Sequence, residues 1–109
     1  MKYFEELQED ILARYGKIRF FKQDPRSGGF SAVVDFKDGY ALSIIRTMLS
    51  YGGEDGLFEA AVLKDDDKVD YDHPIHASGD VLGYLEVDEV YDIVKTLSRV
   101  HNNRHLPER

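Results

Sequence analysis

The sequence predicts a single α+β domain in which an antiparallel meander of four to five strands is covered on one face by an N-terminal and a C-terminal helix. Three observations support this fold class. Apolar residues recur with helical spacing near both ends of the chain and alternate between them. The predicted strands follow one another too closely for parallel crossovers. A length of 109 residues also suffices for one core without disulfides, and the chain has no cysteine. We place the domain at residues 1–100 and expect 101–109 to be a frayed tail.

The N-terminal residues 3–17, YFEELQEDILARYGK, have the pattern of an amphipathic helix. Its apolar stripe consists of four residues at spacings of three and four: Phe4, Leu7, Ile11 and Tyr15. Gly16 is suited to end the helix. The segment KIRFFKQD, residues 17–24, then alternates with a period near two. It predicts a strand with Ile18 and Phe20 on one face.

The Asp38-Gly39 pair predicts a β-hairpin within residues 30–47. A two-residue loop would mix apolar and polar side chains on both faces of the hairpin. A three-residue loop, in which Gly39 supplies the left-handed residue of a bulge, pairs Phe36 with Tyr40 and separates the two kinds of side chain. We therefore expect the three-residue loop, with this apolar face: Phe30, Ala32, Val34, Phe36, Tyr40, Leu42 and Ile44.

The rest of the chain predicts two or three more strands and a helix. LFEAAVL reads as a strand with one apolar side, formed by Phe58, Ala60 and Val62. The three aspartates that follow make a turn into a short strand, KVDYD, which Pro74 ends. We expect a loop and a short extended segment over residues 76–85. VDEVYDIVKTLSRV then predicts a helix whose apolar side comprises Val90, Ile93, Val94, Leu97 and Val100.

The charge of the chain is concentrated in its middle. The whole chain has a net charge of -7, whereas residues 50–92 contain 13 acids and two bases, a net charge of -11. A surface of this sign argues against direct binding to nucleic acid or to an anionic membrane. The N-terminal MKYFEELQEDIL has no apolar run of the length of a signal peptide or membrane helix, so we expect a cytoplasmic protein.

Two groups of residues have the chemistry of metal ligands, and both are incomplete. An EF-hand loop that begins at Asp65 would need an oxygen ligand, a glycine and a glutamate at three later positions, and this sequence has none of them there. His73 with His76, and His101 with His105, are spaced for shared binding, but no cysteine completes a structural zinc site. We therefore predict no metal and no cofactor. Because no residue set indicates catalysis, we also expect a protein that is not an enzyme.

The acidic middle of the chain is the candidate binding surface. We expect its carboxylates to face one way, with exposed tyrosines as anchors, toward a basic protein that itself binds nucleic acid. Such a surface would imitate DNA, which has about one negative charge per ~1.7 Å of its axis. The charge serves only solubility in many acidic domains, which is the alternative interpretation. The candidate partner-binding residues are Tyr51, Glu54, Asp55, Asp65, Asp66, Asp67, Asp70, Tyr71, Asp72 and Tyr84.

Three motifs resemble those of a family of small, uncharacterised phage- and prophage-encoded acidic proteins. YGGEDGLFEAAVL, DHPI and DVLGYLEVDEVYDIV match the family pattern YGG-x-x-G-L-[F/Y]-E-x-A-V, D-x-P-I and D-V-x-G-Y-L-x-x-E-[E]-V. The match spans about residues 40–97. This chain departs from the family at Glu86, where a Ser or Thr helix cap is expected, and in its FSAVVDF strand.

The resemblance implies an accessory protein of a phage or other mobile element that binds and disables host machinery, as anti-CRISPR inhibitors do. We therefore expect a protein-binding inhibitor of a basic, nucleic-acid-binding host protein, acting in the host cytosol. One alternative is a phage accessory or assembly protein that acts as a homo-oligomer, for which a homodimer through Val33, Ala41 and Ile45 on the second hairpin face is one route. The other alternative is a metal-dependent enzyme.

Overall fold

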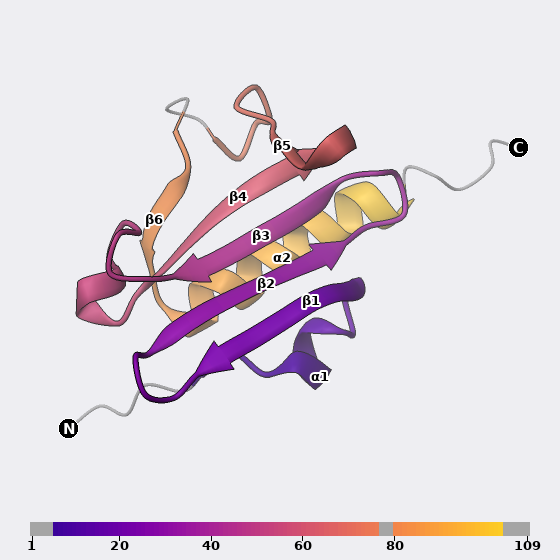
Figure 1. Ribbon diagram of the computed structural model, residues 1–109. Coiled ribbons are helices and arrows are strands. Elements are labelled where there is room, and N and C mark those ends of the chain that lie inside the picture. The colour runs from indigo at the N-terminus through magenta and orange to yellow at the C-terminus, as the bar shows by residue number, and fades with distance from the viewer. Residues whose placement is uncertain (1–5, 77–79, 104–109) are drawn as a thin grey trace, which may run out of the picture.

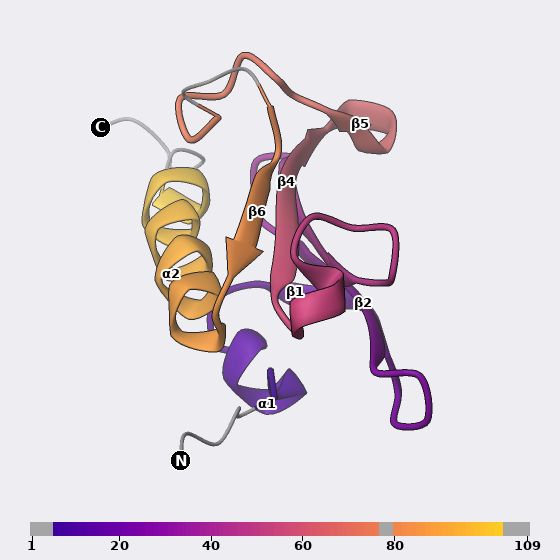
Figure 2. The same cartoon turned by 90° about the vertical axis from the view of Figure 1, so that its left-hand side faces the viewer.

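The computed structural model describes residues 6–76 and 80–103, which form an open antiparallel sheet with helices on one face (Figures 1 and 2). The strands are β1 (Lys17–Asp24), β2 (Gly29–Asp35), β3 (Ala41–Arg46), β4 (Phe58–Lys64), β5 (Lys68–Val69) and β6 (Leu82–Leu85). The helices are α1 (Glu9–Leu12) and α2 (Val87–Asn103), and the short 3-10 helices η1 (Gly53–Asp55) and η2 (Asp65–Asp67) flank β4. This arrangement confirms the predicted α+β fold class.

The sheet is a meander in the order β1-β2-β3-β4-β5, and β6 is an additional partner of β4. β3 occupies one edge of β4, so β5 and β6 share the other edge. β6 pairs with the beginning of β4, at Phe58 and Ala60, and β5 pairs with its end, at Leu63 and Lys64. The predicted KVDYD strand is thus only two residues long, because the chain leaves the sheet after Val69.

The core lies between α2 and the sheet. The hairpin of β2 and β3 has the predicted three-residue loop: Val34 pairs with Leu42, and the Phe36 N–H donates to the Tyr40 carbonyl at 2.8 Å. Gly39 in that loop has a φ of 91°. The predicted apolar faces of the hairpin and of β4 are therefore confirmed. Their buried members are Phe30, Ala32, Val34, Phe36, Leu42, Ile44, Phe58, Ala60 and Val62, and Tyr40 packs against them while partly exposed.

The N-terminal helix is much shorter than the sequence predicts. Only Glu9–Leu12 are α-helical, and the preceding Gln8 is extended, with a φ of -112° and a ψ of 132°. The Gln8 backbone N–H donates to the Tyr91 hydroxyl at 2.9 Å instead of continuing a helix. The buried residues of this segment are Leu7, which belongs to the predicted stripe, and Leu12, which does not. Tyr15 packs against the core while partly exposed, and Phe4 lies outside the described residues.

A β-bulge in β1 reverses the predicted placement of its phenylalanines. Ile18 pairs with Val34 but Phe20 pairs with Val33, so the register shifts between them. The shift places Phe21, not Phe20, on the core face with Ile18, because one extra residue moves all later side chains to the opposite face. Phe21 packs edge-on against a core phenylalanine at 5.2 Å, whereas Phe20 is 46% exposed.

The C-terminal helix extends past residue 100, which corrects the predicted domain boundary. Helix α2 continues to Asn103, and its end is fixed by Asn102, which accepts a hydrogen bond from the Lys37 N–H at 3.0 Å and donates to the Tyr15 carbonyl at 2.9 Å. His101 is fully buried and Val100 is 42% exposed, so His101 takes the place predicted for Val100. The rest of the predicted tail, residues 104–109, lies outside the described residues.

Candidate functional site

The candidate partner-binding residues divide into two groups at opposite ends of β4. Tyr51, Glu54 and Asp55 precede the strand, and Tyr84 on β6 lies beside its beginning. The other six, from Asp65 to Asp72, follow its end. The seven residues of β4 span roughly 23 Å at ~3.3 Å per residue. The predicted continuous acidic surface is therefore divided in two.

Several acids in the second group have partners within the protein. Asp67 accepts a hydrogen bond from Arg19 at 2.7 Å, and the same guanidinium binds Asp35 on the neighbouring strand β2. Asp70 is only 7% exposed and lies 3.6 Å from the Lys64 ammonium. These contacts lower the negative charge that this end of the sheet presents to a partner.

The pairing with Arg19 predicts how stability depends on pH. The hydrogen bond from Arg19 lowers the pKa of Asp67 below its ordinary value of 3.8. A carboxyl whose pKa falls on folding stabilises the native state above the unfolded pKa, and this contribution disappears as pH drops through the folded value. We expect Asp67→Asn to destabilise the protein by an amount that is constant near neutral pH, begins to fall near pH ~4 and disappears as the pH drops through the lowered pKa of Asp67. Urea denaturation of both proteins across this range measures the difference; a difference independent of pH would contradict the pairing.

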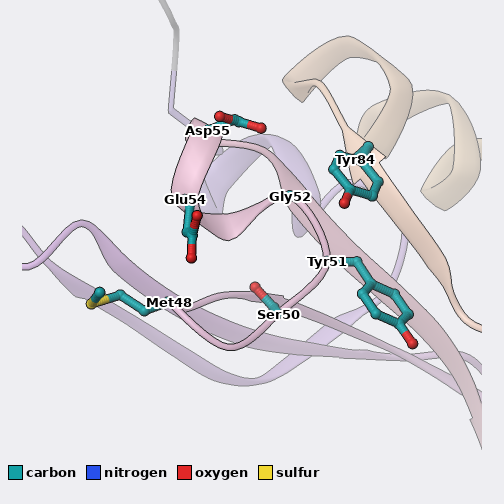
Figure 3. A pocket seen from close by; sticks show the side chains of 7 residues that line it. All are labelled: Met48, Ser50, Tyr51, Gly52, Glu54, Asp55 and Tyr84. Carbon is teal, nitrogen blue, oxygen red and sulfur yellow. The ribbon is translucent and has the colours of Figure 1, made fainter.

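The first group forms a surface because the β3–β4 loop packs against β6 (Figure 3). The Tyr84 N–H donates to the Tyr51 carbonyl at 3.2 Å. Each tyrosine lies against a glycine of the other segment. A Cβ on Gly83 would lie 2.5 Å from the Tyr51 Cβ, and one on Gly52 would lie 2.9 Å from the Tyr84 Cα. Only glycine at these two positions lets the backbones approach so closely.

Tyr84 has an unusual backbone conformation at this contact. Its φ is 57°, in the left-handed region that non-glycine residues seldom occupy. Such a conformation costs about 1–2 kcal/mol and persists only where the surrounding structure imposes it. Here the hydrogen bond to Tyr51 and the contact with Gly52 hold it. The side chain of Tyr84 is consequently turned to solvent and 61% exposed.

The loop presents two further apolar side chains to solvent. Met48 is 77% exposed and Leu49 is 96% exposed. Their position is set by a hydrogen-bonded turn, in which the Ser50 hydroxyl accepts from the Thr47 N–H at 2.8 Å and donates to the Thr47 carbonyl at 2.9 Å. We call the six residues Met48, Leu49, Tyr51, Glu54, Asp55 and Tyr84 the tyrosine surface.

The tyrosine surface combines exposed apolar side chains with two exposed acids. A hollow of about 200 Å³ lies among its side chains and is also lined by Ser50 and Gly52 (Figure 3). Glu54 and Asp55 are both exposed and belong to η1, next to the hollow. The sequence pattern identifies both tyrosines and both acids. It does not identify Met48 and Leu49. The available indication was that these two adjacent apolar residues lie in a loop, just before a pair of glycines.

The histidines form two internal networks instead of an open site. His73 Nε2 lies 2.9 Å from His101 Nε2, and His101 Nδ1 lies 2.7 Å from Asp38 Oδ2. The Ile75 N–H donates to His73 Nδ1 at 3.2 Å, so the proton of that ring is on Nε2. His73 therefore donates to His101, and His101 donates to Asp38. This chain joins the β2–β3 hairpin, the segment after β5, and α2.

His76, at the end of the 70–76 segment, is also held by two internal hydrogen bonds. Its Nε2 accepts from the Val62 N–H at 3.1 Å, and its Nδ1 donates to the Asp80 carbonyl at 2.9 Å. All ring nitrogens of the three described histidines thus take part in internal hydrogen bonds. A metal at any of them would have to displace such a bond. Within residues 6–76 and 80–103, no group of three or more histidine or acidic residues is placed to hold a metal ion; His105 lies outside that range.

Comparison with protein-family models, with curated proteins and with solved structures finds no match to this chain. Among the described residues, none of the helices has both the length and the apolar character needed to cross a membrane.

Proposed function

We propose that this chain is a protein-binding module and that it binds its partner through the tyrosine surface. The observation that carries the proposal is the exposure of Leu49, Met48, Tyr84 and Tyr51 together, at 96, 77, 61 and 50%. Single exposed apolar residues are common, but several on one loop and the strand beside it are typical of interaction sites. Tyrosines in particular are enriched among the residues that dominate binding free energy.

The rigidity of the surface supports the same function. The turn at Thr47–Ser50, the Tyr51–Tyr84 hydrogen bond and the two glycine contacts hold the backbone that carries these side chains before a partner arrives. A surface that is already ordered loses less conformational entropy on binding, which raises affinity. The left-handed backbone of Tyr84 is consistent with this role, because strained residues concentrate at functional sites.

The two acids of the tyrosine surface indicate a basic partner. Glu54 and Asp55 are exposed and form no ion pair with another residue of 6–76 or 80–103, and the chain as a whole has a net charge of -7. Opposite charge on the partner would accelerate association and make it sensitive to salt. We propose, as the more specific function, that the chain comes from a phage or other mobile element and inhibits a basic, nucleic-acid-binding host protein. The charge and the sequence motifs support this step.

Capture experiments with paired variants test the binding surface. The immobilised protein is exposed to nuclease-treated bacterial lysate at low and high salt, and captured proteins are identified by mass spectrometry. We expect Met48→Ser/Leu49→Ser to weaken capture of a specific partner by roughly 10-fold or more, because exposed anchors of this kind contribute above ~1.4 kcal/mol. Glu54→Gln/Asp55→Asn should mainly reduce the salt dependence of capture.

A matched variant at the other end of β4 serves as the control. Asp65→Asn/Asp66→Asn removes the same number of charges from exposed positions outside the tyrosine surface. We expect this variant to capture the partner as the unmodified protein does. The proposal fails if the control loses the partner while Met48→Ser/Leu49→Ser retains it, since binding would then depend on the acids after β4.

A further inference from the structure

A second cavity, of about 490 Å³, lies at the C-terminal half of α2. Its walls come from three parts of the chain: Tyr40 at the end of the hairpin loop, Asp72 and Ile75 in the segment after β5, and Thr96, Leu97 and Val100 on α2. The tyrosine surface contributes no residue to it. A volume of this size is within the range of small-molecule sites, which are mostly apolar with a few polar groups.

The internal histidine network forms part of the wall of this cavity. The His73 ring lines it, and Tyr40 stacks on His101 with ring centroids 4.4 Å apart. His101 is fully buried and bound to both His73 and Asp38. These contacts fix the aromatic side of the cavity, so its shape is set before any ligand enters.

The polar groups around the cavity favour a ligand with a positive charge. The Asp72 carboxylate is exposed and makes no hydrogen bond or ion pair within the described part of the chain, although its backbone N–H binds Asp70. Asp70 also lines the cavity, but it is 7% exposed and lies beside Lys64. The cations on the neighbouring turns of α2, Lys95 and Arg99, are not part of the lining.

We propose that this cavity binds a small organic cation with an apolar body, of the primary alkylamine class. The alkyl chain would lie against Ile75, Leu97 and Val100, and the ammonium would lie near the Asp72 carboxylate. An anion of the same shape would be repelled by the Asp72 carboxylate. This binding is independent of the proposed partner, since the two surfaces share no residue.

Titration of the ¹⁵N-labelled protein with hexylammonium, hexanoate and hexanol tests the site by two-dimensional NMR. We expect saturable shifts of the amides of Asp72, His73 and Ile75 and of residues 96–100 with hexylammonium, weaker binding of hexanol, and the weakest binding of hexanoate. Asp72→Asn should weaken hexylammonium by about threefold, as expected for an exposed charge pair, and leave hexanol unchanged.

A pair of tryptophan variants separates the cavity from non-specific association with the helix. Val100→Trp should fill the cavity and weaken hexylammonium by about 10-fold or more, whereas Arg99→Trp, at a neighbouring position outside the lining, should leave binding unchanged. Three results would each overturn the proposal: no saturable shift with hexylammonium, equal binding of hexanoate, or a Val100→Trp protein that binds as the unmodified one does.

Discussion

Replacing Gly53 with alanine is expected to destroy the tyrosine surface. A Cβ at Gly53 would lie 1.6 Å from the Thr47 carbonyl oxygen and 2.7 Å from the Ser50 hydroxyl, both fixed parts of the turn that presents Met48 and Leu49. Backbone atoms cannot yield this far without rebuilding the loop. We expect destabilisation by about 2–3 kcal/mol, as for an overpacked site, together with loss of partner capture.

Gly56→Ala is the matched control for this prediction. Gly56 ends the same 3-10 helix with a φ of 78°, but a Cβ there meets no atom within 4 Å. Alanine at this position should therefore cause only the backbone strain of the left-handed region, about 1–2 kcal/mol. Urea denaturation and partner capture measure both variants. If Gly53→Ala is no less stable than Gly56→Ala and still captures the partner, the close approach of the loop to Thr47 is wrong.

The second large effect is expected at His101. Alanine would remove a fully buried ring that stacks on Tyr40, and with it the hydrogen bonds to Asp38 Oδ2 and to His73 Nε2. The lost packing and the two lost hydrogen bonds should together cost about 3–4 kcal/mol of the free energy of unfolding. Chemical denaturation followed by far-ultraviolet circular dichroism gives this value.

Val100→Ala provides the comparison at the preceding residue. Val100 is 42% exposed, so its truncation should change stability by about 1 kcal/mol or less. A His101→Asn variant tests the hydrogen bonds separately, because it keeps polar atoms but shortens the side chain. Equal stability of His101→Ala and Val100→Ala would show that the histidine network is not formed in solution.

The sequence predicts well those parts of the fold that depend on local alternation. The hairpin register follows from the requirement that Phe36 and Tyr40 face each other, and the buried side of β4 follows from its period of two. The bulge between Ile18 and Phe20 does not follow from the same rule. Phe20 and Phe21 are adjacent, so one of them faces the core whether or not the strand has a bulge. Only the packing of Phe21 against Phe30 decides between them.

The sequence indicates that His101 lies on the buried side of α2 but does not indicate its hydrogen-bond partners. His101 lies at helical spacing from Val90, Val94 and Leu97, the three residues of α2 that are buried against the sheet. A histidine in such a stripe is buried only when both nitrogens find partners. Those partners, Asp38 and His73, are distant in the sequence, so composition and periodicity alone do not reveal them.

The candidate site was predicted in part. Both tyrosines and the acids Glu54 and Asp55 were identified, but the expectation that they form one surface with the aspartates after β4 was wrong. The net charge of a segment does not indicate where its residues lie in the folded protein. Here β4 lies between the two groups of acids and separates them. The contact that creates the tyrosine surface depends on two mirrored pairs, Tyr51-Gly52 and Gly83-Tyr84, about 30 residues apart.

The most direct test of the tyrosine surface is the contact between its two segments. In the isolated protein, nuclear Overhauser effects are measured between the Tyr51 ring protons and the Gly83 Hα protons, and between the Tyr84 ring and Gly52. The close approach of these groups predicts strong effects for both pairs at neutral pH. If both pairs show none while the β2–β3 hairpin shows its expected cross-strand effects, the folded protein does not assemble this surface, and the proposed binding function loses its basis.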